Sequence, residues 1–410
     1  MWLWGKADGR WAGQDVHCRR MNEAKGILFT AFEPSGDAAA AAVIAELRRR
    51  RPAGRIWALG GPRMAAAGAE LIETTTQHPA MFAEAVGQAW HHGRRVGRLK
   101  RWLRSHAIAA LVPVDSPAAN WSICGAVRRI RPVAKIVHLV APQLWAWAPW
   151  RIRKLRRLTD HVLCLLPFEP AWFEQRGVAA TFVGHRLFEG GMDDRPCAID
   201  RATRTDGEFR LALIPGSRAS EIKANWPCML EVFTDLQRTH RQLRGQVAAV
   251  DADRGELCRQ IAQRQLGDWP GAIEMRAGDI GGVIDWCDAA VVVCGTATLD
   301  VAAGRRPMVA IFQTRHRILG RLARRWLITT DTFALPNLIG QWAGLGRIVA
   351  ELAPLYGEVE PVREAVGRLI EDAGERQRQV AMLGQVAEQF SGVRYASAAA
   401  EQILRVMGEG

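Results

Sequence analysis

Short apolar runs alternate with longer amphipathic stretches along most of the chain. In the first half, these runs are rich in small and branched apolar residues and are 7 to 9 residues long. They are Gly26–Phe32, Arg55–Gly61, Ile108–Asp115, Ala134–Ala141 and Asp160–Phe168. Alternation of this kind is typical of βαβ units on a parallel sheet. We therefore expect an α/β domain over residues 26–190.

A second alternating series follows a polar, turn-rich segment. Residues 191–208 lack an apolar run, as is usual for linkers, and separate the two series. The apolar runs beyond them are Phe209–Arg218, Gly245–Ala252, Ala272–Asp279, Asp288–Gly304 and Arg306–Gln313. The sequence thus predicts a second α/β domain over 209–385. Its ligands would bind beyond the carboxyl ends of the strands, as in other open α/β sheets.

The two ends of the chain have different patterns. Residues 1–25 contain no apolar stretch of signal-peptide length, so we expect a disordered extension, with Met21 as an alternative start. Residues 386–410 have helical apolar spacing and could cross back to the N-terminal domain. The predicted fold class is α/β: two Rossmann-like domains with parallel sheets flanking a cleft, and C-terminal helices packing back across.

Composition narrows the class of protein. The chain has 410 residues, a net charge of +13 and eight cysteines without a Cys-x-x-Cys pair. No zinc site, disulfide framework or cofactor is indicated, and a reducing compartment is the simplest interpretation. The charge suits nucleic acid, anionic lipid or a phosphorylated substrate. No run of about 18 apolar residues occurs, so any membrane contact would be peripheral.

Two polar turns follow predicted strands of the first half. Glu33, Ser35, Gly36 and Asp37 precede an alanine-rich stretch. Ser35 or Asp37 could cap a helix there, or Gly36 could let a substrate approach while the polar side chains face the cleft. Asp115 ends the third run and is either a turn residue or a general base whose pKa is raised by desolvation.

Two more turns follow strands of the second half. Arg218 could clamp a phosphate, with free amides at the start of the next helix, or the turn could be a plain connection. Small and hydroxyl residues at 295–298 allow close approach of a diphosphate, and Asp300 could accept from a ribose or sugar hydroxyl. The candidate diphosphate and sugar ligands are Gly216, Ser217, Arg218, Gly295, Thr296, Ala297, Thr298 and Asp300.

An aromatic and basic stretch lies near the end of the first domain. Three tryptophans stand beside several cations, a combination found at membrane interfaces. The candidate membrane contacts are Trp145, Trp147, Trp150, Arg151, Arg153 and Lys154. A core tryptophan pair beside a solvated basic helix would give the same pattern. No nucleic-acid-binding motif accompanies the stretch, so we do not expect a nucleic acid partner.

These motifs, taken in order, carry a family resemblance. Alongside the four turns and the tryptophan stretch, the chain contains Gly60–Met64, Leu166–Glu169, Val183–His185, Pro307–Val309 and Leu335–Leu338. Together they span nearly the whole globular chain, and they resemble lipid-A-disaccharide synthases. The resemblance implies an inverting glycosyltransferase of GT-B fold. Its members transfer diacylglucosamine from a UDP carrier to lipid X, which is diacylglucosamine 1-phosphate.

The resemblance also implies roles for single residues. Asp115 would be the base, Arg218 and the backbone at 295–298 would hold the diphosphate, and Asp300 and Glu351 would bind ribose or sugar hydroxyls. Asn337 would line the cleft. Because both substrates carry acyl chains, the enzyme would work in the cytoplasm, peripherally on the inner face of the membrane. The oligomeric state is not indicated.

The chain departs from the family pattern in the Asp115 motif. Where the family has a second carboxylate, this chain has Ala118. The Met-Gly-rich segment expected after an early helix reads Gln77–Phe82. Two other functions therefore remain open: a related enzyme that uses another UDP-sugar or glycolipid acceptor, and a catalytically silent lipid-binding paralogue.

Overall fold

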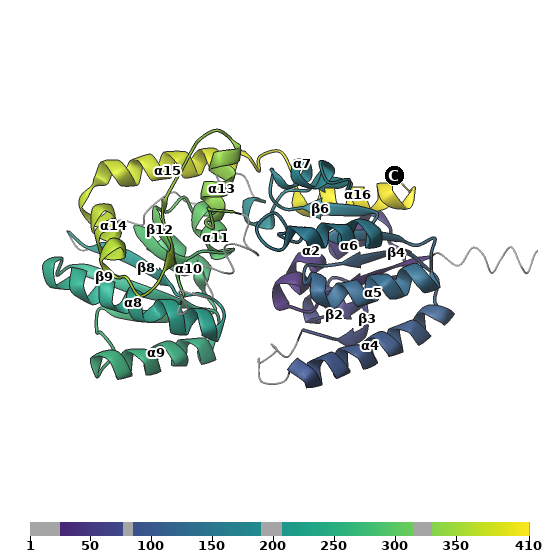
Figure 1. The fold of residues 1–410 in the computed structure, drawn as a ribbon, viewed down its shortest axis with the longest axis horizontal. Helices are drawn as coiled ribbons and strands as arrows, with labels where there is room; N and C mark the ends of the chain where they lie inside the picture. The colour runs from purple at the N-terminus through teal and green to yellow at the C-terminus, as the bar shows by residue number, and fades with distance from the viewer. Residues whose placement is uncertain (1–24, 77–84, 190–206, 315–329, 410) are drawn as a thin grey trace, which may run out of the picture.

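The structure is a computed structural model in which residues 25–76, 85–189, 207–314 and 330–409 are described. It has two halves, each built on one parallel sheet (Figure 1). The predicted extension and most of the predicted linker lie outside the described residues, so these two domain boundaries stay predictions.

The N-terminal sheet has seven strands in the order β3-β2-β1-β4-β5-β6-β7. The strands are β1 (Gly26–Thr30), β2 (Ile56–Gly60), β3 (Glu70–Thr74), β4 (Ile108–Pro113), β5 (Lys135–Leu139), β6 (His161–Cys164) and β7 (Ala180–Phe182). The helices that connect them are α2 (Pro34–Arg50), α3 (Pro62–Ala66), α4 (Ala85–Ser105), α5 (Pro117–Ile130), α6 (Ile152–Leu158) and α7 (Glu169–Glu174). Two single 3₁₀ turns are η2 (Pro149–Arg151) and η3 (Arg186–Phe188).

The C-terminal sheet has six strands in the order β10-β9-β8-β11-β12-β13. They are β8 (Phe209–Ile214), β9 (Leu243–Ala249), β10 (Ile273–Ala277), β11 (Ala289–Val293), β12 (Met308–Gln313) and β13 (Ala350–Leu355). Their helices are α8 (Ala219–Thr239), α9 (Ala252–Leu266), α10 (Ile280–Trp286), α11 (Ala297–Ala303), α13 (Leu335–Trp342), α14 (Glu360–Glu371) and α15 (Ala373–Glu388). A final helix, α16, covers Tyr395–Met407.

Helices cover both faces of each sheet because the strands are apolar on both sides. Successive side chains of a strand point to opposite faces. On β1, Phe29 packs with residues of α2 and α16, whereas Leu28 packs with residues of α4 and α5. On β8, Leu213 packs with α8 and α14, whereas Ala212 packs on the opposite side with α10 and α11. The prediction of two Rossmann-like domains is confirmed.

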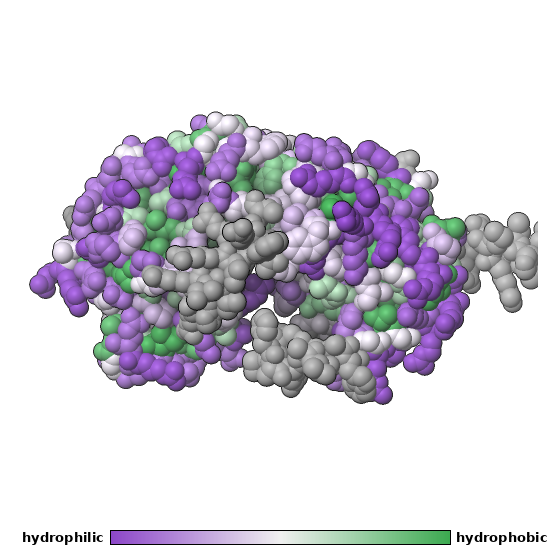
Figure 2. Space-filling view, in the orientation of Figure 1, coloured by the Kyte–Doolittle hydropathy of each residue, from purple (hydrophilic) through white to green (hydrophobic). Residues whose placement is uncertain are grey.

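The last helix returns to the first domain. In Figure 1, α16 lies over the N-terminal half, beyond α15 of the other half. Its Tyr395 is buried in the N-terminal core and donates a hydrogen bond to the carbonyl oxygen of Ala39 at 3.0 Å. The predicted packing of C-terminal helices across both domains is therefore observed. Figure 2 shows a hollow between the two halves with hydrophilic residues visible inside it.

Candidate functional site

A strained turn presents Asp115 at the carboxyl end of β4. Asp115 and Ser116 have φ angles of +47° and +37°, in the left-handed region that non-glycine residues rarely adopt. The Asp115 amide donates to the carbonyl oxygen of Leu139 at 3.0 Å, which ties the turn to β5. Pro117 then begins α5, where its missing N–H and fixed φ suit a first helical position.

Asn120 fixes the backbone of this turn through hydrogen bonds. It is fully buried, and its Nδ2 donates to the carbonyl oxygens of Val114 at 3.1 Å and Asp115 at 2.9 Å. Its Oδ1 accepts from the hydroxyl of Thr30 at 2.6 Å. No role for Asn120 is predicted from the sequence. Its position in the motif was the available signal, because a side chain in the first turn of a helix can reach back to the carbonyl groups of the preceding turn.

Charged groups of both domains act on Asp115. Burial raises the pKa of the half-buried Asp115 above its ordinary value, a hydrogen bond from the Ser116 backbone acts in the opposite direction, and the nearby carboxylate of Glu33 raises the pKa further. Arg218, from the other domain, lowers this pKa and so favours the charged form. Glu33 also accepts a hydrogen bond from the hydroxyl of Ser116 at 3.2 Å. The structure therefore brings together three predicted site residues at the carboxyl ends of two sheets.

The Arg218 turn differs from the prediction in one respect. The amides of Ser217 and Arg218 donate to Oε2 of Glu221 at 3.0 and 3.1 Å, so they are not free for a phosphate. The Arg218 guanidinium pairs with Oε1 of Glu221 at 3.0 Å, and its side chain is 68% exposed. Gly216 has a φ of +107°, and a Cβ there would lie 2.7 Å from the Cβ of Glu221. Ser217 and Arg218 are both exposed, so their side chains stay candidates for contact with a diphosphate.

The turn after β11 contains both exposed and buried predicted residues. Gly295 adopts a φ of +151°, a conformation open to glycine alone, and Thr296 is exposed. Ala297 and Asp300 are half-buried on α11. The buried Thr298 donates to the carbonyl oxygen of Gly295 at 2.6 Å and accepts from the amide of Leu335 at 3.3 Å. Its hydroxyl thus already joins α11 to α13, and its contact with a phosphate stays a prediction.

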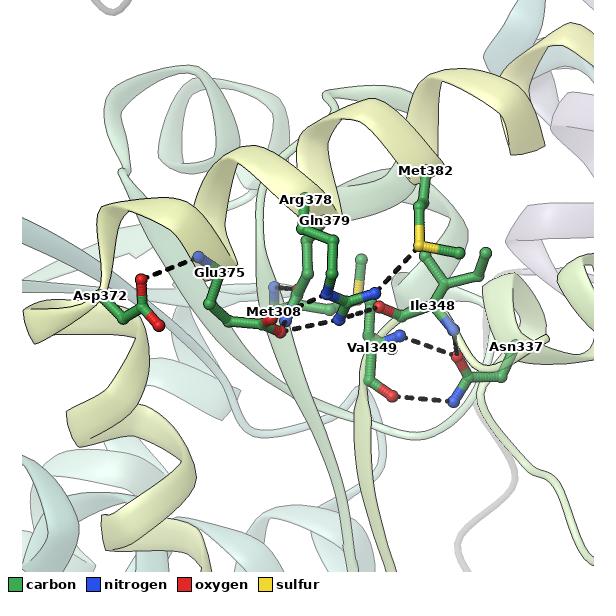
Figure 3. A network of polar contacts seen from close by, with 9 residues as sticks. All are labelled: Met308, Asn337, Ile348, Val349, Asp372, Glu375, Arg378, Gln379 and Met382. Carbon is green, nitrogen blue, oxygen red and sulfur yellow. Dashed lines mark hydrogen bonds and ion pairs between the residues drawn. The ribbon is translucent and has the colours of Figure 1, made fainter. Parts of the chain in front are cut away.

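Asn337 and Glu351 also use their polar atoms in hydrogen bonds within the fold. The Asn337 amide makes four hydrogen bonds, accepting from the amides of Ile348 and Val349 and donating to the carbonyl of Val349 and to Glu351 (Figure 3 shows the first three). Glu351 is 8% exposed and also accepts from the amide of Phe333 at 2.6 Å. Asn337 is fully buried, so its predicted position on the cleft surface is wrong. The pair fixes the loop before β13 instead.

The turn after β1 shows the same use of polar groups within the fold. Asp37 is buried and accepts from the amides of Gly61, Arg63 and Met64 at 2.9 to 3.1 Å, so it caps α3 and not its own helix. Gly36 is buried, and a Cβ there would lie 3.3 Å from Ala31. Gly36 and Asp37 are therefore buried within the fold, and their substrate contacts stay predictions. Glu33 and Ser35 are exposed.

The tryptophan stretch divides into a buried and an exposed part. Trp145 is 8% exposed, packs among residues of the C-terminal domain and donates to Glu169 at 3.0 Å, so its predicted membrane contact is wrong. Burial raises the pKa of Glu169 to about 7. Trp147 and Trp150 are 48% and 54% exposed. Arg153 and Lys154 are exposed as well, whereas Arg151 is half-buried.

Arg151 and Lys154 lie against an aromatic ring that the sequence analysis did not single out. The ring is that of Trp121 on α5, 4.4 Å from the guanidinium carbon of Arg151 and 4.6 Å from the ammonium of Lys154. Within the described ranges, no cluster of His, Cys, Asp or Glu could hold a metal ion, and no helix is long and apolar enough to cross a membrane.

Comparison with solved structures defines the class of the protein. The UDP co-structure of MnaA from S. aureus matches with a TM-score of 0.63 and 8% identity, covering 94% of this chain and 98% of that one. MurG of Acinetobacter baumannii matches with a TM-score of 0.55 and 12% identity, covering 93% and 99%. At these identities the likeness shows the fold alone, and this fold is the two-domain GT-B fold.

Sequence relatives identify the family. The family model described as Lipid-A-disaccharide synthetase matches residues 27–403. A lipid-A-disaccharide synthase of Anaeromyxobacter dehalogenans is 33% identical over 93% of this chain and 97% of its own length. Another, from Myxococcus xanthus, is 32% identical over 94% and 98%. The chain belongs to the lipid-A-disaccharide synthase family and is a glycosyltransferase.

Proposed function

We propose that this enzyme transfers diacylglucosamine from its UDP carrier to a hydroxyl of diacylglucosamine 1-phosphate, with Asp115 as the base. The observation that carries the proposal is the environment of Asp115. A strained turn fixes its carboxylate, burial raises its pKa, and Arg218 of the other domain acts on it. A base works best when its pKa approaches the working pH and its position is fixed.

The chemistry is a single displacement. Asp115 takes the proton of the acceptor hydroxyl, and the hydroxyl oxygen bonds to the anomeric carbon of the donor. The bond from that carbon to the phosphate oxygen breaks, and UDP leaves with the electron pair. Attack from the face opposite to UDP inverts the configuration of the anomeric carbon. Arg218 offsets the charge that develops on the departing diphosphate.

The donor would bind against the C-terminal sheet. The support is the exposed guanidinium of Arg218 together with the turn at Gly295 and Thr296, where no Cβ limits the approach of a ligand to Gly295. Asp300 and Glu351 would bind hydroxyls of the ribose or sugar. Because Glu351 already accepts two hydrogen bonds, it would do so through a remaining lone pair.

The absence of a carboxylate at residue 118 does not weaken this assignment. Ala118 is exposed in the first turn of α5, whereas Asp115 is half-buried next to Glu33 and Arg218. A carboxylate at residue 118 would face solvent, and its pKa would have little reason to rise. This contrast favours Asp115 as the base over any side chain at residue 118.

Contact with the membrane would be peripheral, at the cytoplasmic face of the inner membrane. Both substrates carry acyl chains, and the chain has a net charge of +13 that attracts anionic lipid. The exposed Trp147, Trp150 and Arg153 support a contact of this kind, since indoles and cations favour the interface.

The test is disaccharide formation and UDP release by the purified full chain, given UDP-diacylglucosamine and diacylglucosamine 1-phosphate. Asp115→Asn should lower kcat by about 10²- to 10⁴-fold, the usual contribution of a general base. The matched control is Asp253→Asn, which changes an exposed aspartate of α9 and should leave kcat unchanged. Wild-type protein that binds UDP without any turnover would instead favour the silent lipid-binding paralogue.

A further inference from the structure

Two cations of the N-terminal domain are held by an indole ring and not by carboxylates. Arg151 and Lys154 both lie over Trp121, and Arg151 also lies 5.3 Å from the ring of Trp147. Within the described part of the chain, neither side chain forms an ion pair or a hydrogen bond. A ring face orients a cation but leaves its charge unneutralised. Both groups therefore keep their capacity to bind an anion.

Neighbouring cations of the same layer are neutralised by carboxylates. Arg128 of α5 pairs with Asp160 at 2.7 Å, and Arg95 of α4 pairs with Glu73 at 2.9 Å. In such pairs, N–H donors of the guanidinium are already used in bonds within the protein. The contrast distinguishes Arg151 and Lys154 from the general positive charge of this surface.

The two cations lie at the same edge of the sheet as the proposed base. In parallel α/β units, each helix begins at the carboxyl edge, where ligands bind. Pro117 begins α5 two residues after Asp115, and Trp121 is one helical turn further, about 6 Å along the axis. Arg151 lies at the start of α6.

The ring that holds the two cations also carries a polar group. Trp121 is 7% exposed, and its Nε1 has no hydrogen-bond partner in the part of the chain that the structure describes. Buried N–H groups without an acceptor are rare in folded proteins. An anion bound by the two cations would bring acceptor oxygens close to this indole.

We infer that Arg151 and Lys154, oriented by Trp121, bind the phosphomonoester of the acceptor. This assignment rests on the proposed function, because the acceptor named there carries a phosphomonoester on its anomeric carbon. Arg151 would contact two phosphate oxygens with its planar fork, and Lys154 a third. The phosphate would then orient the acceptor so that its hydroxyl faces Asp115.

A bilayer headgroup carries the same phosphate chemistry and is the competing source. Burial argues against it for Arg151, which is half-buried between two rings, whereas Arg153 on the other side of α6 is exposed. A bilayer contact would use the exposed Arg153 with Trp147 and Trp150. The acceptor would use Arg151 together with Lys154, which lie over the same ring.

The first experiment measures binding without turnover. Calorimetry would compare a short-chain, water-soluble diacylglucosamine 1-phosphate with the same compound lacking phosphate, on wild-type protein, Arg151→Met and Lys154→Met. Methionine keeps an apolar stem against Trp121 and removes the charge. Each variant should weaken binding of the phosphorylated compound about ten- to a hundredfold, the worth of one charge-assisted hydrogen bond. Binding of the phosphate-free compound should not change.

Arg129→Met is the matched control. Arg129 is an exposed arginine in the last turn of α5, at the edge of the sheet opposite to Asp115, and has no part in the proposed sites. Wild-type binding of both compounds with equal affinity would overturn the assignment. So would an equal loss on both compounds in the variants.

The second experiment distinguishes binding of the acceptor from binding of a bilayer headgroup. It also distinguishes failure of this phosphate site from failure of the proposed reaction. In detergent micelles, the two variants should raise KM for the acceptor while KM for the donor stays unchanged, and binding to vesicles containing anionic lipid should stay at the wild-type level. Lost vesicle binding with an unchanged acceptor KM would overturn the assignment in favour of a headgroup. Phosphate-dependent binding without any turnover would keep this site and reject the proposed function.

Discussion

At the scale of single residues, burial and local bonding separate the base candidate from other polar groups. Asp37, Thr298 and Asn337 all follow the family pattern, yet each uses its polar atoms within the fold. Asp115 is different, because its backbone is fixed by hydrogen bonds while its half-buried carboxylate receives charge effects from both domains. Asp37, Thr298 and Asn337 are buried as well as bonded, whereas Asp115 is half-buried, which makes its carboxylate the better candidate for chemistry.

The pH dependence of the rate should follow the raised pKa of Asp115. The base must be ionised to accept a proton, so kcat/KM should fall as the pH drops through that pKa. Because burial and Glu33 raise the pKa, this fall should begin at a higher pH than for an ordinary aspartate, whose pKa is about 3.9. A profile of kcat/KM against pH measures the pH at which this fall begins.

The variant Glu33→Gln sharpens this test. Removing the neighbouring carboxylate should move the acidic limb of the profile to lower pH, since one of the causes of the raised pKa is lost. The control Glu401→Gln changes an exposed glutamate of α16 and should leave the limb in place. A limb that stays at the same pH in Glu33→Gln would contradict the arrangement of the two carboxylates.

Residue roles were harder to predict from sequence than residue positions. The four motifs do lie at the carboxyl ends of strands, and Asp115 and Arg218 are brought together as expected. The sequence does not show that Asp37 accepts from amides at the start of α3, because that contact forms only in the tertiary structure, whereas Glu221 accepts locally from the amides of Ser217 and Arg218. Trp121 was missed because an isolated aromatic residue on a helix is typical of core packing.

At the scale of elements, the strand, turn and helix from β4 to α5 form one positioning device. The buried Asn120 joins the carbonyls of Val114 and Asp115 to the hydroxyl of Thr30 on β1. These bonds offset the cost of two consecutive left-handed residues, about 1 to 2 kcal/mol each. Asn120 is therefore a positioning residue for the base.

Asn120→Ala should uncouple the turn from β1. Loss of three buried hydrogen bonds should lower the free energy of unfolding by about 2 to 4 kcal/mol. It should also lower kcat, with KM for the donor unchanged, because the carboxylate of Asp115 loses its fixed position. Denaturant unfolding and steady-state kinetics measure the two effects.

A control matched for stability separates position from folding. Ile123→Ala creates a cavity at a fully buried position of the same helix. It should lower the free energy of unfolding by about 2 to 5 kcal/mol without moving the Asp115 turn. Its kcat should stay near wild type. If both variants lose kcat in proportion to stability, Asn120 has only a structural role.

The elements that sequence reasoning missed are mostly sheet edges. The interior strands stood out because helices cover both faces and the strands are apolar throughout. The edge strands β3, β7 and β13 were not predicted. On β3, with the sequence ELIET, no residue is fully buried, and β13 contains Pro354. Edge strands bury less surface, so their sequences carry a weaker pattern.

At the scale of the whole molecule, an aromatic cluster joins the two domains where the chain crosses back. Phe390 lies between α15 and α16, is 1% exposed and stacks on Phe188 with ring centroids 4.0 Å apart. Phe182 and His185 complete the cluster from the N-terminal side. Phe390 also packs in the same core cluster as Trp145 and β11. The relative position of Asp115 and Arg218 thus depends on this junction.

Phe390→Ala should loosen the junction. Removing a fully buried aromatic ring costs about 3 to 5 kcal/mol, and here the lost contacts join two domains. Calorimetry should show the unfolding transition broaden or split, and kcat should fall because Arg218 is no longer held opposite Asp115. The control Phe173→Ala removes an equally buried ring whose neighbours all belong to the N-terminal domain. It should lower stability without uncoupling the domains, so the same splitting in both variants would show that Phe390 has no special role between them.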